Sequence, residues 1–255
     1  MVPVRFRAAT TLAIACSVVA SACGGGLLGK EYEYEEEIRL SVDGAARINL
    51  NASVPALAAL RGVDLDPDPN AQIDRATVRT VFEGPGAEVT SVRLSRREGR
   101  RFVHVRVEVD DIRQLSQLAP FSWSTYQFDR RGEVLEFKQR VGSPSRREVG
   151  DVGWNGSELV AFRMHIPSVI AFHNAPSREV RRGNILEWEQ PLAERLKGVP
   201  IDVQVSMEPD SILYTTLLLF GSTIVLAAIA FGVVIWRVAR HGREGSSKPL
   251  HPTSG

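Results

Sequence analysis

The stretch Ile38–Asn51, IRLSVDGAARINLN, decides how this chain folds. Apolar and polar side chains alternate on both sides of Asp43–Gly44, and Ile38, Leu40 and Val42 would share one face. Such alternation with a period of two is typical of strands that bury one face. An Asp-Gly pair between two such strands favours a two-residue type I′ turn. We therefore expect a β-hairpin here, as the first unit of an antiparallel sheet.

The same alternation recurs along residues 31–210, separated by turn signals and by short helical segments. Helices are predicted after the capping residues Ser53, Asn70 and Asp110. The further predicted strands are 89–95, 102–109, 121–128, 134–141, 158–166, 169–172, 179–182, 185–189 and 201–207. These segments predict an α+β fold, mostly antiparallel β, with two or three short helices. A division near residue 150 into two β subdomains stays open.

The N-terminal segment has the pattern of an export signal. Arg5 and Arg7 precede an apolar stretch that is too short to cross a bilayer. Small residues then lead to a cysteine in Ala20–Cys23, as in bacterial lipoprotein signals, although Ala20 stands where leucine, valine or isoleucine is usual. We expect residues 1–22 to be a lipoprotein-type signal peptide and Cys23 to be lipidated. Plain cleavage without lipidation is the alternative.

A second apolar segment lies near the C-terminus. Ile212–Trp236 contains no charged residue and is long enough to cross a bilayer as a helix. Arg237, Arg240 and Arg243 follow it, and the positive-inside rule places them in the cytoplasm. The expected location is the bacterial cell membrane, as a single-pass protein with its N-terminal domain outside. The predicted order is signal peptide (1–22), Gly-rich tether (23–30), extracytoplasmic β-rich domain (31–210), transmembrane helix (211–237) and basic cytoplasmic tail (238–255).

Composition excludes several classes of function. The chain has 255 residues, and 31 Lys and Arg residues against 30 Asp and Glu residues give a net charge of +1. That balance argues against a nucleic-acid partner. Of the two cysteines, Cys16 is lost with the predicted signal peptide and Cys23 is processed or lipidated. The outer domain therefore has no disulfide, no thiol nucleophile and no cysteine-bound metal.

No catalytic or metal-binding motif stands out in the outer domain. A Gly-x-Ser-x-Gly elbow, a phosphate-binding loop and a His-Glu-x-x-His pair are all absent. Asp64, Asp66, Asp68 and Asn70 have the spacing of a calcium loop, but the glycine and glutamate that complete such a loop are missing. We interpret these residues as an acidic loop that caps the next helix. No cofactor and no metal is expected, since His104, His165 and His173 also lack ligand spacing.

Two groups of arginines could contact lipid headgroups or sugar phosphates. The first surrounds the predicted turn between 89–95 and 102–109, and the second lies in 178–182. The alternative in both cases is an ordinary polar loop. The acidic run Glu31–Glu37 is interpreted as the solvated start of a strand, with cation binding or repulsion from anionic lipid as the alternatives. The residues of the first group are Arg96, Arg97, Arg100 and Arg101, and those of the second are Arg178, Arg181 and Arg182.

The layout resembles the LppM-type bacterial envelope lipoproteins. Ile166–Ile170 reads as a strand led by a proline, and Asn174–Pro176 as an asparagine turn. Arg182–Trp188 then contains the pattern Gly-Asn-x-x-x-Trp, and the early strand pair around Asp43–Gly44 is similar too. The resemblance implies a small β domain on the outer face, associated with envelope lipids or glycolipids, with no known catalysis. Read from the residues themselves, the two asparagines and Trp188 are turn and core residues.

The expected function is that of a non-enzymatic, membrane-anchored envelope protein. Its outer domain would bind an amphiphile, either a lipid or a glycolipid, or another envelope protein. Binding of a lipid inside the domain predicts an aliphatic cavity of about 300 Å³ or more. The alternative is a hydrolase of envelope polymers, with a pair of carboxylates that the sequence does not reveal. The oligomeric state stays open.

Overall fold

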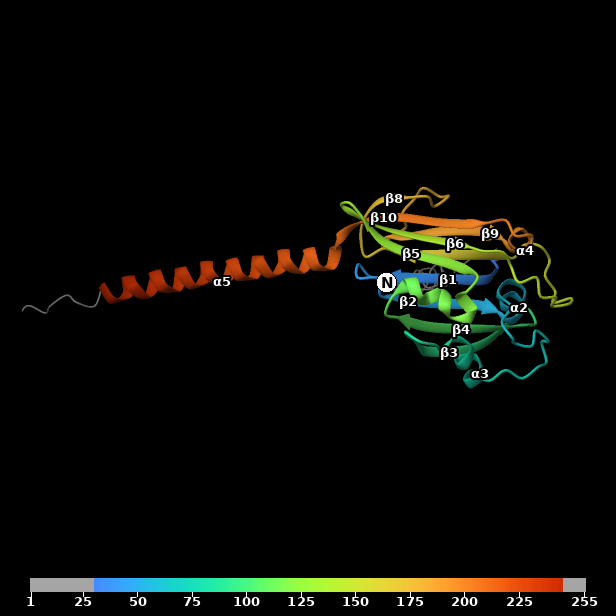
Figure 1. Cartoon of the computed structure of the whole chain (residues 1–255). Helices are drawn as coiled ribbons and strands as arrows, with labels where there is room; N and C mark the ends of the chain where they lie inside the picture. The colour runs from blue at the N-terminus through green and yellow to red at the C-terminus, as the bar shows by residue number, and fades with distance from the viewer. Residues whose placement is uncertain (1–29, 245–255) are drawn as a thin grey trace, which may run out of the picture.

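Ten strands form two sheets within residues 30–244, the part of the chain that the computed structural model describes (Figure 1). Sheet A has the order β3-β4-β2-β1-β7-β9, and sheet B has the order β5-β6-β10-β8. Neighbouring strands are antiparallel, except that β1 and β7 are parallel. The strands are β1 (Tyr32–Leu40), β2 (Ala46–Ser53), β3 (Ala87–Arg97), β4 (Arg100–Val109), β5 (Ser124–Arg131), β6 (Val134–Val141), β7 (Leu159–His165), β8 (Ser168–His173), β9 (Ile185–Pro191) and β10 (Ile201–Ser211). The α+β, mostly antiparallel fold is confirmed.

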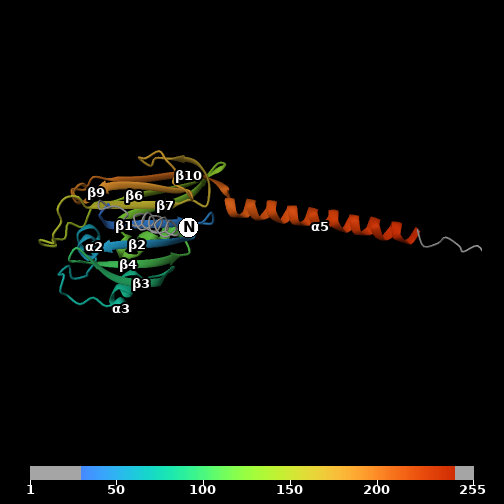
Figure 2. The ribbon, with the colours of Figure 1, turned by 180° about the vertical axis from the view of Figure 1, so that it is seen from behind.

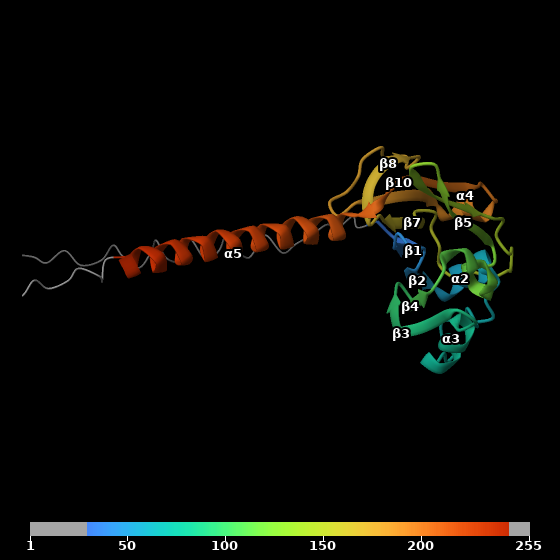
Figure 3. The same cartoon turned by 60° about the vertical axis from the view of Figure 1, so that its left-hand side comes forward.

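One face of sheet A is covered twice, by sheet B and by helices (Figure 3). Sheet B packs over β1, β7 and β9, where Phe137 and Val203 meet Ile38, Phe162 and Trp188. The helices of residues 54–61, 75–82 and 112–117 pack over the other half, against β2, β3 and β4, whereas the helix of residues 192–196 lies against β7 and β9. Both sheets combine strands from before and after residue 150, and one apolar core joins them. The helices are α2 (Val54–Arg61), α3 (Arg75–Phe82), η2 (Ile112–Gln117), η3 (Ala119–Phe121) and α4 (Leu192–Leu196).

The predicted hairpins form, but two of the turns differ from expectation. Between β1 and β2, Ser41 N–H donates to Ala45 O at 2.8 Å, and Gly44 alone has a positive φ, +95°. A type I′ turn needs two positive φ angles, so the prediction of this turn type was wrong. Between β3 and β4, Glu98 and Gly99 have φ values of +50° and +76°. The type I′ signature therefore occurs there, and pairing extends to the hairpin tip.

The helix starts show where capping predictions succeeded. Ser53 Oγ accepts from Ala56 N–H at 3.1 Å and begins α2, as predicted. The predicted start of α3 was wrong, because Asp74 rather than Asn70 accepts from Thr77 N–H, at 2.7 Å. Likewise η2 begins after Asp111, one residue later than predicted. The predicted strand at 179–182 is reduced to a single bridge between Arg181 and Ile185.

The domain has two ends, which the strand directions define. β10 runs directly into α5 (Ile212–Glu244), and β4 ends at the same end, so the β3–β4 hairpin tip lies at the opposite end (Figures 1 and 2). Within α5, Thr216–Arg237 is long and apolar enough to cross a membrane, which fits a membrane-associated protein. The predicted signal peptide, Cys23 and residues 245–255 lie outside the described residues.

Candidate functional site

A buried ion pair lies where sheet A, sheet B and α2 meet. Glu36 on β1 and Arg61 at the end of α2 both have fully buried side chains, and Arg61 Nη2 donates to Glu36 Oε2 at 2.5 Å. Tyr34 Oη (2.8 Å), Tyr126 Oη (3.1 Å) and Gln139 Nε2 (2.9 Å) also donate to the Glu36 carboxylate. The carboxylate is therefore saturated with donors from three strands.

The surroundings of this pair favour a structural role. Burial raises the pKa of Glu36 to about 7, against the hydrogen bonds from Gln139 and Tyr126, and burial lowers the pKa of Arg61 to about 9. The attraction across 2.5 Å favours the charged form of both groups. The Arg61 guanidinium also lies 4.4 Å from the ring centres of Tyr34 and Trp123. The pair thus joins the layers of the domain and leaves no atom of Glu36 exposed for chemistry.

A second buried carboxylate, Glu33, pins the loop 142–158 to the sheet. Arg100 donates to Glu33 Oε1 at 3.1 Å, and Trp154 Nε1 donates to Glu33 Oε2 at 3.2 Å. Arg100 also donates to Gly153 O at 3.1 Å. The interpretation of Glu31–Glu37 as a solvated strand start was therefore wrong for Glu33 and Glu36. Glu36 faces the core, and the loop 142–158 covers Glu33.

Strand alternation divides the four arginines of the hairpin tip into two pairs. Arg97 and Arg100 face each other across the strands and point to the outer face of sheet A, where Glu33 lies. We call them the outer arginine pair. Arg96 and Arg101 also face each other but point to the inner side, with Leu94 and Val103. We call them the inner arginine pair.

The inner pair holds the loop that follows α2. Arg96 Nη2 donates to Pro69 O at 2.7 Å, and Arg101 Nη2 donates to Asp66 O at 3.1 Å and to Asp68 O at 2.5 Å. Within the described residues, neither arginine forms an ion pair with a carboxylate. Burial, and then the neighbouring guanidinium of Arg96, lower the pKa of Arg101. Two like charges thus face each other at this position, and the carboxylates of Asp66 and Asp68 offset them only in part, from beyond ion-pair distance.

Beside the inner pair is a cleft of about 220 Å³ with an apolar wall, which we call the hairpin cleft. Val54 and Val103 form its buried part, and Leu94, which is 37% exposed, lies at its mouth. Ile73 closes it from the loop before α3. It is smaller than the 300 Å³ expected of a cavity that encloses a lipid. It therefore has room for part of an amphiphile, with two arginines at its rim.

The space between the two sheets is filled. The gap bordered by Ile38, Phe137, Phe162 and Val203 has no room for a water molecule. An acyl chain therefore has no cavity at this position in the described structure.

The calcium-like loop is used for turns and arginine contacts. Asp66 Oδ1 and Asp68 Oδ1 accept from the backbone N–H two residues later, at 2.9 and 2.7 Å, and Asp64 pairs with Arg147 at 3.1 Å. In residues 30–244, no three His, Cys, Asp or Glu side chains lie close enough to hold a metal ion. The expected role of this loop as the cap of the next helix is also not met, because Asp74 supplies the cap.

The remaining candidate residues lie apart from the hairpin cleft. His104 lies between Asn51 and Ser95, at 2.9 and 2.8 Å, and His165 Nε2 is 3.0 Å from Glu37. Arg181 pairs with Glu187 at 2.8 Å. The other members of these two groups are His173, whose Nδ1 accepts from the backbone of Ala175, and the exposed Arg178 and Arg182.

Sequence reasoning missed the buried charges, although one signal was present. The alternation through Ile38 and Leu40, followed backwards, places Glu36 and Tyr34 on the core face of β1. The partner Arg61 could be placed in the last turn of α2 but not in the core. Its partners lie on strands that only the tertiary fold brings together.

Comparisons with known proteins yield a weak likeness. No protein-family model and no curated protein matches the chain. A solved structure, the folded domain of Mycobacterium tuberculosis LppM determined by NMR, is 15% identical over 72% of this chain and 94% of that domain, with a TM-score of 0.39. This likeness agrees with the resemblance to LppM-type lipoproteins, and at this TM-score nothing about function follows from it.

Proposed function

We propose that this is a non-enzymatic, membrane-anchored envelope protein whose outer domain binds an anionic amphiphile at the hairpin cleft. The observation that carries the proposal is the inner arginine pair, which forms no ion pair within the described residues and borders an apolar wall. An anionic headgroup placed between Arg96 and Arg101 would relieve their repulsion and gain charge-assisted hydrogen bonds. Leu94 and Val103 would cover the first part of an acyl chain.

The position of the cleft restricts the source of the ligand. β4 has ten residues, so the hairpin tip lies about 30 Å along the sheet from the end that leads into α5. A lipid that stays inserted in the bilayer of α5 does not reach that far when the domain stands on its helix. We therefore expect an amphiphile that has left this bilayer, or one that belongs to a facing layer. If the outer domain binds another envelope protein at this cleft instead of an amphiphile, the proposal is replaced by that interaction.

The alternative function, a hydrolase of envelope polymers, can be tested at one pair of carboxylates. Glu108 and Asp110 line a shallow groove of about 380 Å³ near the β1–β2 turn. Glu108 is already paired with Arg47 at 2.9 Å, and that pairing favours a structural role. If the protein binds an amphiphile and is not a hydrolase, the double variant E108Q/D110N should leave both the envelope polymers and the amount of bound lipid unchanged. Loss of a hydrolytic product in this variant would favour the enzyme instead.

Native mass spectrometry of the full chain tests the proposed function. The protein is extracted from membranes of its own cells, and lipids that remain bound are released and identified. We expect one class of anionic amphiphile with the unchanged protein and a loss of it in L94N and R101A. R93A is the matched control, because Arg93 lies on the same strand and is exposed on the opposite face. Equal lipid content in all variants would refute the proposal.

A further inference from the structure

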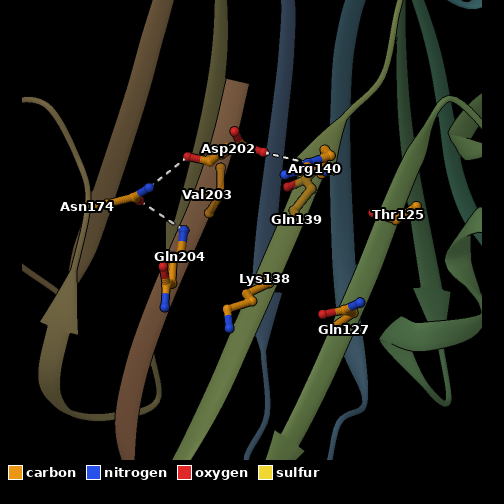
Figure 4. Close-up of a pocket in the computed structure, with 9 residues that line it drawn as sticks. All are labelled: Thr125, Gln127, Lys138, Gln139, Arg140, Asn174, Asp202, Val203 and Gln204. Carbon is orange, nitrogen blue, oxygen red and sulfur yellow. Dashed lines mark hydrogen bonds and ion pairs between the residues drawn. The ribbon is translucent and has the colours of Figure 1, made fainter. Parts of the chain in front are cut away.

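The exposed face of sheet B carries a groove that the proposed function does not use. It has a volume of about 440 Å³ and crosses β5, β6 and β10 (Figure 4). Asn174, directly after β8, closes one side: its Nδ2 donates to Asp202 O, and its Oδ1 accepts from Gln204 N–H, both at 2.9 Å. This side of the groove is therefore fixed by hydrogen bonds to the backbone of β10.

The charges of the groove cancel within it or beside it. Arg140 Nε lies 3.1 Å from Asp202 Oδ1, as the dashed line in Figure 4 shows. Lys138 Nζ donates to Glu136 at 2.9 Å, and Gln204 Nε2 donates to the same carboxylate at 2.8 Å. These exposed pairs leave little excess charge in the groove to attract an ionic ligand. The groove is therefore suited to an uncharged ligand.

The remaining polar lining is made of amides and a hydroxyl. Figure 4 shows Thr125 and Gln127 on β5, beside their β6 neighbours Arg140 and Lys138. Among the described residues, neither of these two side chains has a hydrogen-bond partner. Amides and hydroxyls both donate and accept, and so do the hydroxyls of sugars. The apolar residue of the lining, Val203, is buried and offers no pocket to a peptide side chain.

We propose that this groove binds an uncharged, polyhydroxylated ligand, a neutral glycan segment. The site is separate from the hairpin cleft and holds whether or not an amphiphile binds there. Gln127 supplies hydrogen bonds from one side of the groove, and Gln204 supplies them from the other through its Oε1 and the N–H that Glu136 does not accept. An extended peptide is disfavoured, because recognition of its side chains needs apolar pockets that the groove lacks.

Titration of the full chain with neutral sugars tests this site. The protein is placed in phosphatidylcholine nanodiscs, since sugar-based detergents would compete. Linear pentasaccharides of glucose, mannose and galactose are titrated into the protein, and their binding is measured by isothermal titration calorimetry. At least one should bind with a Kd of about 1 mM or lower. Q127A/Q204A should weaken that binding about tenfold, at roughly one neutral hydrogen bond per side chain.

The same titration supplies a control variant and the results that would overturn the proposal. Q114A, an exposed glutamine in η2 outside the groove, should bind like the unchanged protein. The proposal is overturned if no neutral pentasaccharide binds, or if Q127A/Q204A binds as well as Q114A. It is also overturned if a uronic acid oligomer or an unstructured peptide binds more tightly in the groove than the neutral sugars.

Discussion

The outer and inner arginine pairs occupy one hairpin tip and differ in what neutralises them. Arg97 and Arg100 share the buried carboxylate of Glu33, and Arg100 also meets Glu98 at 2.7 Å. Arg96 and Arg101 meet only backbone carbonyls of the loop after α2. The same residue type, at adjacent positions of each strand, therefore stabilises the fold on one face and remains available to a ligand on the other. The role of a basic residue therefore depends on the sheet face that it occupies and on the group that neutralises it.

The largest effect is expected from breaking the outer pair. R100A leaves the fully buried Glu33 without its main partner, and we expect a loss of about 3–5 kcal/mol in the free energy of unfolding. R96A, its counterpart in the inner pair, should change that free energy by less than about 0.5 kcal/mol. Urea unfolding of the full chain in micelles, followed by tryptophan fluorescence, measures both. Equal losses would remove the distinction between the pairs.

A smaller loss is expected from the indole that completes the Glu33 site. W154F keeps an aromatic ring and removes the 3.2 Å hydrogen bond to the buried carboxylate. The expected loss is about 1–2 kcal/mol, as for other bonds to charged groups. Hydrogen exchange should rise in residues 142–158, because the loop loses one of its attachments. Unchanged exchange there would contradict the role assigned to Trp154.

The inner pair should matter for binding more than for folding. R101A removes a donor to an anionic headgroup, and we expect affinity for an acyl phosphate to fall about tenfold. R93A should leave that affinity unchanged, since Arg93 lies on the opposite face of β3. Fluorescence anisotropy of a labelled acyl phosphate measures both variants. A tenfold loss in R93A, with none in R101A, would reverse the assignment of the faces.

The smallest effect is a pH dependence on the outer face of the hairpin. Burial lowers the pKa of His104 below its usual 6.5. The folded protein then binds fewer protons there than the unfolded chain, so this contribution to stability is present above pH 6.5 and is lost as the pH falls. H104Q should therefore lose less stability between pH 7.5 and pH 5 than the unchanged protein. The raised pKa of Glu36 acts with the opposite sign but is common to both proteins. Parallel unfolding curves at both pH values would contradict the expected difference.

The alternation of apolar and polar residues predicted most of the strands and part of the candidate site at the β3–β4 hairpin. It placed the hairpin around Asp43–Gly44 and the strands of β3 and β4, because a half-buried strand exposes every second residue. The same rule separates Arg96 and Arg101 from Arg97 and Arg100 once their register is known. Register is fixed by the turn, and the Glu98–Gly99 turn extended the pairing beyond the predicted strand ends.

The rest depended on contacts between distant segments. Glu33 is buried because Trp154, 121 residues later, covers the outer face of β1. The hairpin cleft exists because the loop carrying Pro69 and Ile73 folds back onto β3. Neither contact has a local sequence signal. Position in a strand predicts the face of a residue, whereas the segment that covers this face follows only from the tertiary fold.

Photo-crosslinking tests the central claim most directly. The full chain is mixed with an acyl phosphate that carries a photoactivatable group near its headgroup, and the labelled residues are mapped by mass spectrometry. Binding at the hairpin cleft predicts labels on Leu94, Val103 and Ile73, which an excess of unlabelled ligand removes. Labels confined to α5, or to the outer face of sheet A beside Arg93, would contradict the account.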